Sequence, residues 1–322
     1  MSKKLRLAFI VDPLADLKAY KDSSIAMMRA ARDRGHEIWT IQQPAIRWER
    51  GTGGSGVVSA PATRLTVKDD DHDWFEETAH QTHALKEFDA VLMRKDPPFD
   101  IEFVTTTWLL ECAEREGAKV FNSPRALRDH SEKLAIAEFP EFTVPGLVSR
   151  DMDALQHFID AERDVVLKPL DGMGGSSIFR IHRNDPNRNV IVETLTQFGA
   201  RTVMAQRYIP EISAGDKRIL IIDGKPMPYS LARIPKAGET RGNLAAGGTG
   251  VAQELSARDR RIAEALGPVL VTRGLLLVGI DVIGDHLTEI NVTSPTCMVE
   301  IRTQTGFDPA VAFIVALEHR CA

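Results

Sequence analysis

The fold of this chain is decided by the stretch Gly279-Ile280-Asp281-Val282-Ile283-Gly284-Asp285-His286-Leu287-Thr288-Glu289-Ile290-Asn291-Val292. The pattern predicts a β-hairpin in which Asp281, Glu289 and Asn291 interrupt otherwise apolar strands. Glu289 and Asn291 are two residues apart, so in a strand they share one face. Oxygen ligands on one face suit a hard cation such as Mg²⁺, which binds through a few carboxylates together with substrate phosphates.

The turn of this hairpin decides whether Asp281 joins the other two side chains. A three-residue loop from Gly284 to His286 places Asp281 opposite Glu289 on the same face. A two-residue Gly284-Asp285 loop shifts the register and turns one of them away. We expect the three-residue loop. The alternative for the whole stretch is a solvated hairpin face that binds nothing.

Composition is typical of a globular protein with two or three packed units. The chain has 322 residues, of which 43% are hydrophobic and 26% are charged. A net charge of -5 provides no basic surface for nucleic acid or an anionic membrane, so we expect neither partner. No segment approaches the roughly 18 apolar residues that a membrane span needs.

The first residues and the cysteines bear on the compartment in which the protein works. The apolar run 5–11 ends at Asp12-Pro13, which predicts a buried strand and not a signal peptide. The three cysteines lie far apart without a CxxC pair, at Cys112, Cys297 and Cys321. This spacing favours a reducing compartment and argues against a disulfide or zinc framework.

The first third of the chain alternates strands and helices, which predicts a parallel sheet covered by helices. We expect strands at 5–11, 37–41, 90–93 and 119–121, and helices at 23–34 and 101–116. Ligands of such sheets bind at the carboxyl ends of the strands. The polar residues that follow the predicted strands are Asp12, Arg94, Lys95 and Asp96.

A glycine-rich stretch at 51–56 matches the GxGxxG pattern of dinucleotide-binding proteins. That pattern requires a helix that opens at the last glycine. The residues that follow, 57–61, end in a proline and do not start a helix, so we expect a flexible surface loop. The chain also lacks a Walker A sequence, which argues against a P-loop nucleotide site.

We expect three domains. The first covers residues 1–122, the second 123–205 and the third 206–322, with a flexible loop at 236–251. Asn122-Ser123-Pro124 resembles a helix start and marks the first boundary. The second unit has predicted helices near 124–138, 151–162 and 187–198, and strands near 164–169, 178–181 and 201–208. The third opens with the hairpin 217–226, where Asp223-Gly224 is a type I′ turn signal, and closes with a helix at 309–319.

A buried lysine followed by glycines is the clearest phosphate-binding feature. Lys168 ends an apolar strand, and the turn that follows contains Gly172, Gly174 and Gly175. Glycines allow close approach of backbone N–H groups to a phosphate, and the lysine supplies the charge. The alternative is an ordinary hairpin with a snorkelling lysine. Lys133, on the predicted helix 124–138, offers a second and weaker cation.

Two further segments suit nucleotide and anion binding. The strand 204–210 can offer backbone groups to an adenine edge, although a plain connecting strand is the alternative. Arg218 and Arg233 lie on the two arms of the predicted hairpin, where they would meet a phosphoryl group or a carboxylate. Surface salt bridges are the alternative for both arginines.

The loop 236–251 and the segment 293–297 complete the candidate site. The loop is long and glycine-rich, which is typical of a lid that excludes water, and Arg241 and Asn243 are its polar tips. The hydroxyls of Thr293, Ser294 and Thr296 can hold a small substrate, or can simply cap a turn. Cys297 has no evident histidine partner, so we interpret it as structural. The whole set suits phosphoryl transfer in which a substrate supplies the nucleophile.

These motifs resemble one family closely. The runs 92–100, 167–177, 232–248 and 287–297, together with Asp12-Pro13 and 21–24, resemble prokaryotic glutathione synthetases, which are ATP-grasp ligases. The lysine, the glycine loop and the Asp…Glu-x-Asn pattern are common to ATP-grasp proteins. The run Met93-Arg94-Lys95-Asp96-Pro97-Pro98-Phe99-Asp100 and the lid sequence are more specific. The resemblance covers nearly the whole chain.

The resemblance implies an α/β ATP-grasp fold with an N-terminal Rossmann-like domain. It implies ATP-dependent joining of γ-glutamylcysteine to glycine through an acyl phosphate, with Mg²⁺ or Mn²⁺. It also implies a cytosolic homotetramer. The implied metal ligands are Asp281, Glu289 and Asn291. The implied ATP-binding residues are Lys133, Lys168, Gly172, Gly174, Gly175, Gln206, Arg207, Tyr208, Ile209 and Asp216. The implied catalytic residues are Arg218, Arg233, Arg241 and Asn243, and the implied substrate-binding residues are Arg94, Ser294 and Thr296.

Two alternatives remain at this point. The first is another ATP-grasp ligase with a different acid or amine, for which the fold and metal site would be the same. The second is a nucleotide-binding module without turnover, against which the lid and the metal residues argue, because binding alone needs neither.

Overall fold

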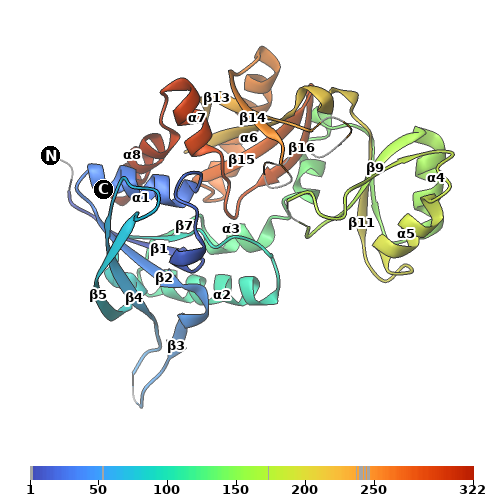
Figure 1. Ribbon diagram of the computed structural model, residues 1–322. Helices are drawn as coiled ribbons and strands as arrows, with labels where there is room; N and C mark the ends of the chain where they lie inside the picture. Colours follow the sequence, from blue (N-terminus) through green and yellow to red (C-terminus); the bar gives the residue numbers. More distant parts are fainter. Residues whose placement is uncertain are drawn as a thin grey trace.

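The computed structural model describes residues 3–52, 54–172, 174–236, 238, 242, 244 and 247–322. The described residues form three β-sheets with helices on their faces (Figure 1). Short 3₁₀ turns connect many of the elements, at Leu14–Asp16, Gln43–Ala45, Leu85–Glu87, Leu134–Glu138, Pro140–Phe142 and Pro210–Ala214. No described helix combines the length and apolarity that spanning a bilayer requires.

The N-terminal sheet has a parallel core, as the strand-helix alternation predicts. Its order is β3-β4-β2-β1-β6-β7, with β5 paired to β4. The strands are β1 (Arg6–Val11), β2 (Glu37–Gln42), β3 (Arg47–Glu49), β4 (Val57–Val67), β5 (Phe75–Ala84), β6 (Ala90–Met93) and β7 (Val120–Phe121), and the helices are α1 (Ser23–Asp33) and α2 (Ile101–Arg115). β2, β1, β6 and β7 run parallel, and β3 to β5 add antiparallel strands that the sequence analysis missed.

The glycine-rich stretch 51–56 lies between β3 and β4, which pair as an antiparallel hairpin. The last glycine is therefore followed by a strand and not by a helix, so the dinucleotide interpretation is excluded by the local fold. At the carboxyl ends of β1 and β6 the expected polar residues do meet. Lys95 Nζ lies 2.7 Å from Asp12 Oδ1, and the Asp96 N–H donates to Asp12 Oδ2 at 3.0 Å.

The four-stranded sheet forms a lobe with its own core. Its order is β10-β9-β11-β8, all antiparallel. The elements are β8 (Gly146–Ser149), α4 (Met152–Glu162), β9 (Asp164–Pro169), β10 (Phe179–His182), α5 (Arg188–Thr196) and β11 (Val203–Arg207). Leu155 and Ile159 of α4 and Val192 of α5 pack on the buried face of β9. In Figure 1 this lobe stands apart from the two other sheets.

The five-stranded sheet is antiparallel, in the order β14-β13-β12-β15-β16. Its elements are β12 (Asp216–Ile222), β13 (Lys225–Ile234), β14 (Thr249–Glu254), α6 (Ala257–Thr272), β15 (Leu277–Ile283), β16 (His286–Asn291), α7 (Met298–Thr305) and α8 (Pro309–Cys321). Asp223 and Gly224 both have positive φ, as the predicted type I′ turn requires. Phe313 and Ile314 of α8 share a buried cluster with α1, so the last helix ties this sheet to the first.

The predicted helix 124–138 is wrong in its second half. α3 (Pro124–Asp129) ends at His130, whose backbone is extended. The next residues pair instead with the end of β16, because the Ile290 N–H donates to the Glu132 carbonyl at 2.8 Å. The Glu132 carboxylate also accepts from the Val292 N–H at 2.8 Å. These tertiary bonds override the local helical preference and place Lys133 in a turn.

The predicted domain boundaries remain a prediction. The first boundary, at 122/123, coincides with the end of the N-terminal sheet. The second, at 205/206, falls inside β11, which belongs entirely to the four-stranded sheet.

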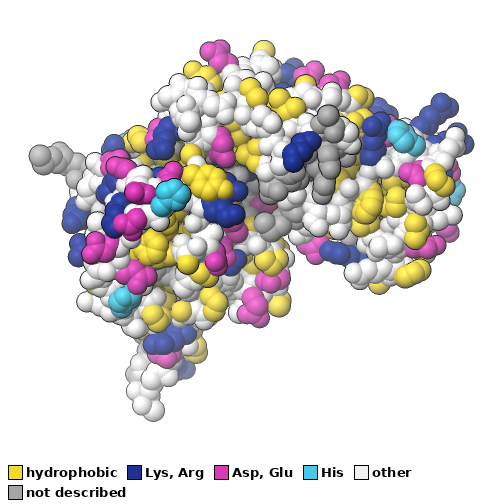
Figure 2. All heavy atoms as spheres, in the orientation of Figure 1, with side chains coloured by type: hydrophobic (Ala, Val, Ile, Leu, Met, Phe, Trp, Pro, Cys, Tyr) yellow, Lys and Arg dark blue, Asp and Glu magenta, His cyan; other side chains and the backbone are white. Residues whose placement is uncertain are grey.

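On the face shown in Figure 2, Lys and Arg side chains lie among Asp and Glu and form no extended basic area. The expectation that nucleic acid is not a partner stays a prediction.

Asn122 connects the N-terminal sheet to the C-terminal one and provides a test of this packing. Its buried side chain donates to the Leu277 and Val292 carbonyls at 2.8 and 2.9 Å and accepts from the Leu277 N–H at 2.9 Å. Asn122→Ala leaves these backbone groups without partners and should lower the thermal unfolding midpoint by about 5 °C. The matched control is exposed Asn187→Ala, which should leave the midpoint unchanged. Equal midpoints for the two variants would contradict the proposed link.

Candidate active site

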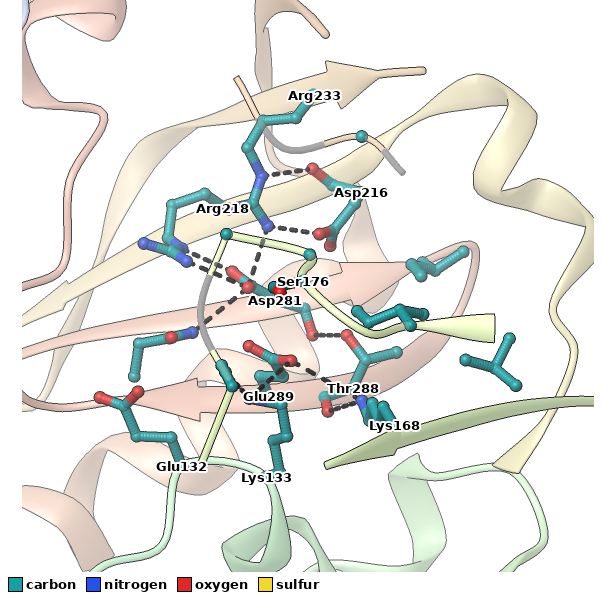
Figure 3. A pocket seen from close by; sticks show the side chains of 18 of the residues that line it. Glu132, Lys133, Lys168, Ser176, Asp216, Arg218, Arg233, Asp281, Thr288 and Glu289 are labelled. Atoms are coloured by element: carbon teal, nitrogen blue, oxygen red, sulfur yellow. Dashed lines mark hydrogen bonds and ion pairs between the residues drawn. The ribbon is translucent and has the colours of Figure 1, made fainter. Parts of the chain in front are cut away.

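A cavity of about 330 Å³ opens between the four-stranded and five-stranded sheets. It brings together most of the residues that the sequence singles out. These are Lys133, Lys168, Gly172, Gly174, Gly175, Gln206, Arg207, Tyr208, Ile209, Asp216, Arg218, Arg233, Asp281, Glu289, Asn291, Ser294 and Thr296. Arg94 is not among the lining residues, and Arg241 and Asn243 lie outside the described part of the chain. Figure 3 shows the central side chains of this cavity.

The hairpin β15–β16 has a two-residue turn, so the expected three-residue loop is wrong. Ile283 pairs with His286, and Gly284-Asp285 forms the turn. The register then shifts at Thr288, which is passed over, and Asp281 pairs with Glu289. The added residue is a β-bulge, and it returns the two carboxylates to one face. The expected pairing of Asp281 with Glu289 is therefore correct, although it arises in a different way.

Asp281 is the centre of a buried ionic cluster. Arg218 lies beside it on β12, and its guanidinium donates to the two carboxylate oxygens at 2.5 and 3.0 Å. Arg233 on β13 adds a contact of 2.9 Å, and the Asn291 amide donates at 3.2 Å. Burial alone would raise the pKa of Asp281, but the two arginines outweigh it and hold that pKa below its usual range.

Asp216 is a second, partly buried carboxylate that lies directly across from Arg233 in the β12–β13 ladder. Arg233 donates to its Oδ2 at 2.5 Å, and its Oδ1 is buried with no hydrogen-bond partner among the described residues. Burial raises the pKa of Asp216 to about 7, and the negative charges of Asp281 and Glu289 add to this effect against the attraction of Arg233. An acceptor oxygen without a donor suits a ligand hydroxyl.

Two buried lysines meet the third carboxylate of the site. Lys133 Nζ and Lys168 Nζ each lie 3.7 Å from Glu289 Oε1. Each also donates to a carbonyl, Lys133 to Gly172 at 2.5 Å and Lys168 to Thr288 at 3.4 Å. Burial, with the positive charge of Lys133, lowers the pKa of Lys168 below its ordinary value. The contacts of 3.7 Å to Glu289 are long, so both ammonium groups remain able to bind a stronger anion.

The glycine loop joins two antiparallel strands, β9 and β10, as the sequence predicts. Gly174 and Gly175 have φ of +63° and +80°, a conformation that other residues rarely adopt. A Cβ at Gly172 would lie 2.9 Å from the Pro169 ring. The loop is therefore restricted to glycine where it passes the lysines, which fits close approach of its backbone to phosphate oxygens.

The end of β11 offers backbone groups to the cavity. The N–H groups of Arg207 and Tyr208 donate to the Pro145 and Asp164 carbonyls at 2.9 Å each. The Ile209 N–H has no backbone partner among the described residues, so it is available to a ligand. The Arg180 guanidinium lies 3.5 Å from the centre of the Tyr208 ring. Arg180 is a lining residue that the sequence analysis missed, because nothing in the sequence shows that β10 and β11 both pair with β9, which brings Arg180 to the end of β11.

The three predicted substrate-binding residues, Arg94, Ser294 and Thr296, lie in two different places. Ser294 and Thr296 line the cavity. Arg94 is buried behind them, where it donates to Ser24 Oγ at 3.1 Å and to the Pro295 carbonyl at 3.0 Å. One of its terminal nitrogens has no partner among the described residues. Cys297 is buried, which raises the pKa of its thiol and favours the structural interpretation over a nucleophilic one.

The donor set fits a hard cation. The described residues contain no group of three or more His, Cys, Asp and Glu side chains that could enclose a metal. The set here is two carboxylates and one amide, and the Asn291 amide nitrogen donates to Asp281 and Gly279. This orientation leaves the Asn291 carbonyl oxygen without a donor among the described residues. Oxygen atoms of this number suit an ion that takes its other ligands from water and phosphates.

The comparisons with known proteins agree with this geometry. A family model described as the prokaryotic glutathione synthetase N-terminal domain matches residues 5–128, and a model of the ATP-grasp domain of the same enzymes matches residues 132–306. The chain is 60% identical over 314 residues to a glutathione synthetase of Ralstonia nicotianae, which covers 98% of this chain and 95% of the relative. It is 58% identical over 320 residues to one of Nitrosomonas europaea, with 99% of each chain covered.

Solved structures share the fold at low identity. The D-cycloserine synthetase DcsG superposes with a TM-score of 0.68 at 17% identity, covering 98% of this chain and all of the other. The ATP-grasp ligase PsnB in complex with its minimal precursor superposes with a TM-score of 0.65 at 18% identity, covering 99% of both chains. These likenesses establish the ATP-grasp fold and nothing finer.

The ionic cluster predicts that Asp281 and Glu289 contribute differently to stability. Asp281→Asn leaves two buried arginines without their anion and should destabilise the protein by about 3 kcal/mol or more. Glu289→Gln removes a partly exposed carboxylate with long contacts and should cost less than about 1 kcal/mol. Urea unfolding of both variants, with exposed Glu264→Gln as control, measures this difference. A Glu289→Gln variant as unstable as Asp281→Asn would contradict the arrangement.

Proposed function

The chain belongs to the prokaryotic glutathione synthetase family and is an ATP-dependent ligase that forms glutathione; on this basis we propose a role for each part of its cavity. The observation that carries the assignment of roles is the alignment of Arg218, Arg233, Asp281 and Glu289 on one face, beside Lys133 and Lys168. Such a face suits the transfer of a phosphoryl group between two anions.

We propose that ATP lies between the two sheets. Lys133 and Lys168 exchange Glu289 for the phosphates, and the loop of Gly172, Gly174 and Gly175 covers them. The free Ile209 N–H, with the neighbouring backbone of Gln206 to Tyr208, binds the adenine edge. The unpartnered oxygen of Asp216 accepts from a ribose hydroxyl.

Asp281, Glu289 and Asn291 are the proposed ligands of Mg²⁺ or Mn²⁺, which when bound would neutralise phosphate charge. The arginines act on the substrates. Arg218 and Arg233 hold the cysteinyl carboxylate of γ-glutamylcysteine in line with the γ-phosphoryl group. An oxygen of this carboxylate attacks the phosphorus of the γ-phosphoryl group. ADP leaves, and an acyl phosphate forms. The amine of glycine then attacks the acyl carbon, and phosphate leaves as the peptide bond forms.

The remaining substrate contacts are proposed from the resemblance. We place Ser294 and Thr296 near the carboxylates of glycine or the dipeptide, and Arg94 near the dipeptide. Arg241 and Asn243 retain their proposed catalytic roles from the resemblance alone. The described lid residues Gly242 and Leu244 line the cavity, which supports a lid that excludes water from the acyl phosphate. We also propose a cytoplasmic homotetramer, which rests on the resemblance.

The D-cycloserine synthetase DcsG shares this fold at 17% identity, so the assignment of γ-glutamylcysteine and glycine rests on the relatives and not on the fold. The substrates are tested by phosphate release from ATP and Mg²⁺ with γ-glutamylcysteine. We expect release that depends on glycine and equals the glutathione formed. ATP binding without stimulation by this pair would contradict the proposed substrates and leave the fold unaffected.

The proposed role of Glu289 is tested in the same assay. Glu289→Gln should lower turnover about a hundredfold or more at low Mg²⁺, because one metal ligand loses its charge while the fold is kept. Exposed Glu264→Gln should leave the rate unchanged. A Glu289→Gln rate equal to that of the wild type at all Mg²⁺ concentrations would refute the metal assignment.

A further inference from the structure

We propose that Thr288 is a positioning residue of the ligase reaction, which forms the bulge that brings Glu289 beside Asp281 and whose carbonyl oxygen orients the Lys168 ammonium. The proposal rests on the metal and phosphate roles proposed above for Asp281, Glu289 and Lys168. Thr288 itself is not proposed to contact ATP or the substrates. It acts through the three residues around it, which come from β9, β15 and β16.

The register of β15 and β16 shows why a bulge is needed. From the turn, Ile283 pairs with His286 and Val282 with Leu287. Regular pairing would continue with Asp281 opposite Thr288 and would place Glu289 opposite Ile280. Ile280 is fully buried and faces away from Asp281, so Glu289 would then point into the core. The bulge at Thr288 avoids this outcome and restores Glu289 to the cavity face.

The side chain of Thr288 secures the bulge. Its hydroxyl donates to the Asp281 carbonyl at 3.1 Å, across the same pair of strands. Thr288 is 7% exposed, so this bond is shielded from water. Figure 3 shows the Thr288 side chain bonded to the strand that carries Asp281. A side-chain bond between the bulged residue and the residue opposite favours this register over regular pairing.

The backbone of Thr288 has a second partner. Because the bulge removes this residue from the regular ladder, its carbonyl oxygen accepts from Lys168 Nζ, at 3.4 Å. Lys168 is almost fully buried and its other contact, Glu289 Oε1, lies 3.7 Å away. One neutral acceptor thus sets the direction of the ammonium while the charge stays available. The same residue thereby aligns a metal ligand and a phosphate cation.

The test removes the hydroxyl and keeps the shape. Thr288→Val is isosteric, and Thr288→Ala removes the same donor in a smaller side chain if the valine variant does not fold. Thr288→Ser restores the donor. The matched control is Thr196→Val, because Thr196 is fully buried in α5 and its hydroxyl also donates to a carbonyl, that of Val192, at 2.7 Å.

The first readout is Mn²⁺ binding in the presence of a non-hydrolysable ATP analogue, measured by electron paramagnetic resonance. The loss of one buried hydrogen bond that favours the bulge should raise the dissociation constant about fivefold to tenfold. The second readout is steady-state kinetics. The KM for ATP should rise and kcat should fall, while the KM for glycine stays unchanged. Thr288→Ser should retain most of the wild-type values.

The outcomes separate this inference from the function on which it rests. Wild-type protein that forms glutathione, with Thr288→Val and Thr288→Ala binding Mn²⁺ as tightly as Thr196→Val, would overturn the role of Thr288 alone. Wild-type protein that binds Mn²⁺ and nucleotide without forming glutathione would overturn the function. In that case the binding measurement still decides the role of Thr288.

Discussion

The structure depends on one buried ionic arrangement, in which Asp281 on β15 accepts from Arg218 on the adjacent strand β12 and from Arg233 on the next strand, β13. Three adjacent strands must be in register for these groups to meet, because a one-residue slip would move any of them to the opposite face. The β12–β15 and β12–β13 ladders provide that register. Breaking the arrangement would leave buried charge without compensation, so the fold and the site depend on the same contacts.

The same arrangement explains how so many charges are held in one cavity. The lining side chains of the described residues include six cations and five carboxylates. Each of these cations contacts a carboxylate or a carbonyl oxygen. Several of these contacts are long, as between the two lysines and Glu289. Anionic substrates and a metal can replace such contacts without leaving a buried charge unpaired. With the proposed roles, binding exchanges partners inside the cavity, and the sheet beneath them does not need to move.

Much of the fold and of the candidate site could be predicted from the sequence. The features that could not be predicted have physical causes. Local patterns were sufficient for the alternating elements of the N-terminal sheet, for the Asp223-Gly224 turn and for the lysine–glycine loop. The bulge at Thr288 could not be predicted, because the hydrogen bonds that stabilise it are made with Asp281 and Lys168, on other strands. The end of α3 depends on pairing with β16, and the place of Arg180 depends on the order of strands. Long-range contacts of this kind leave no periodic signal in the chain.

In the proposed reaction, the cysteinyl carboxylate beside Arg218 and Arg233 is phosphorylated before the amine of glycine attacks it. The most direct measurement uses γ-glutamylcysteine labelled with ¹⁸O in the cysteinyl carboxylate and follows the label into phosphate by mass spectrometry. An acyl phosphate requires that one labelled oxygen leave with each phosphate when the amine of glycine attacks. We expect one ¹⁸O in the phosphate formed per glutathione. Unlabelled phosphate, formed together with glutathione, would contradict the account.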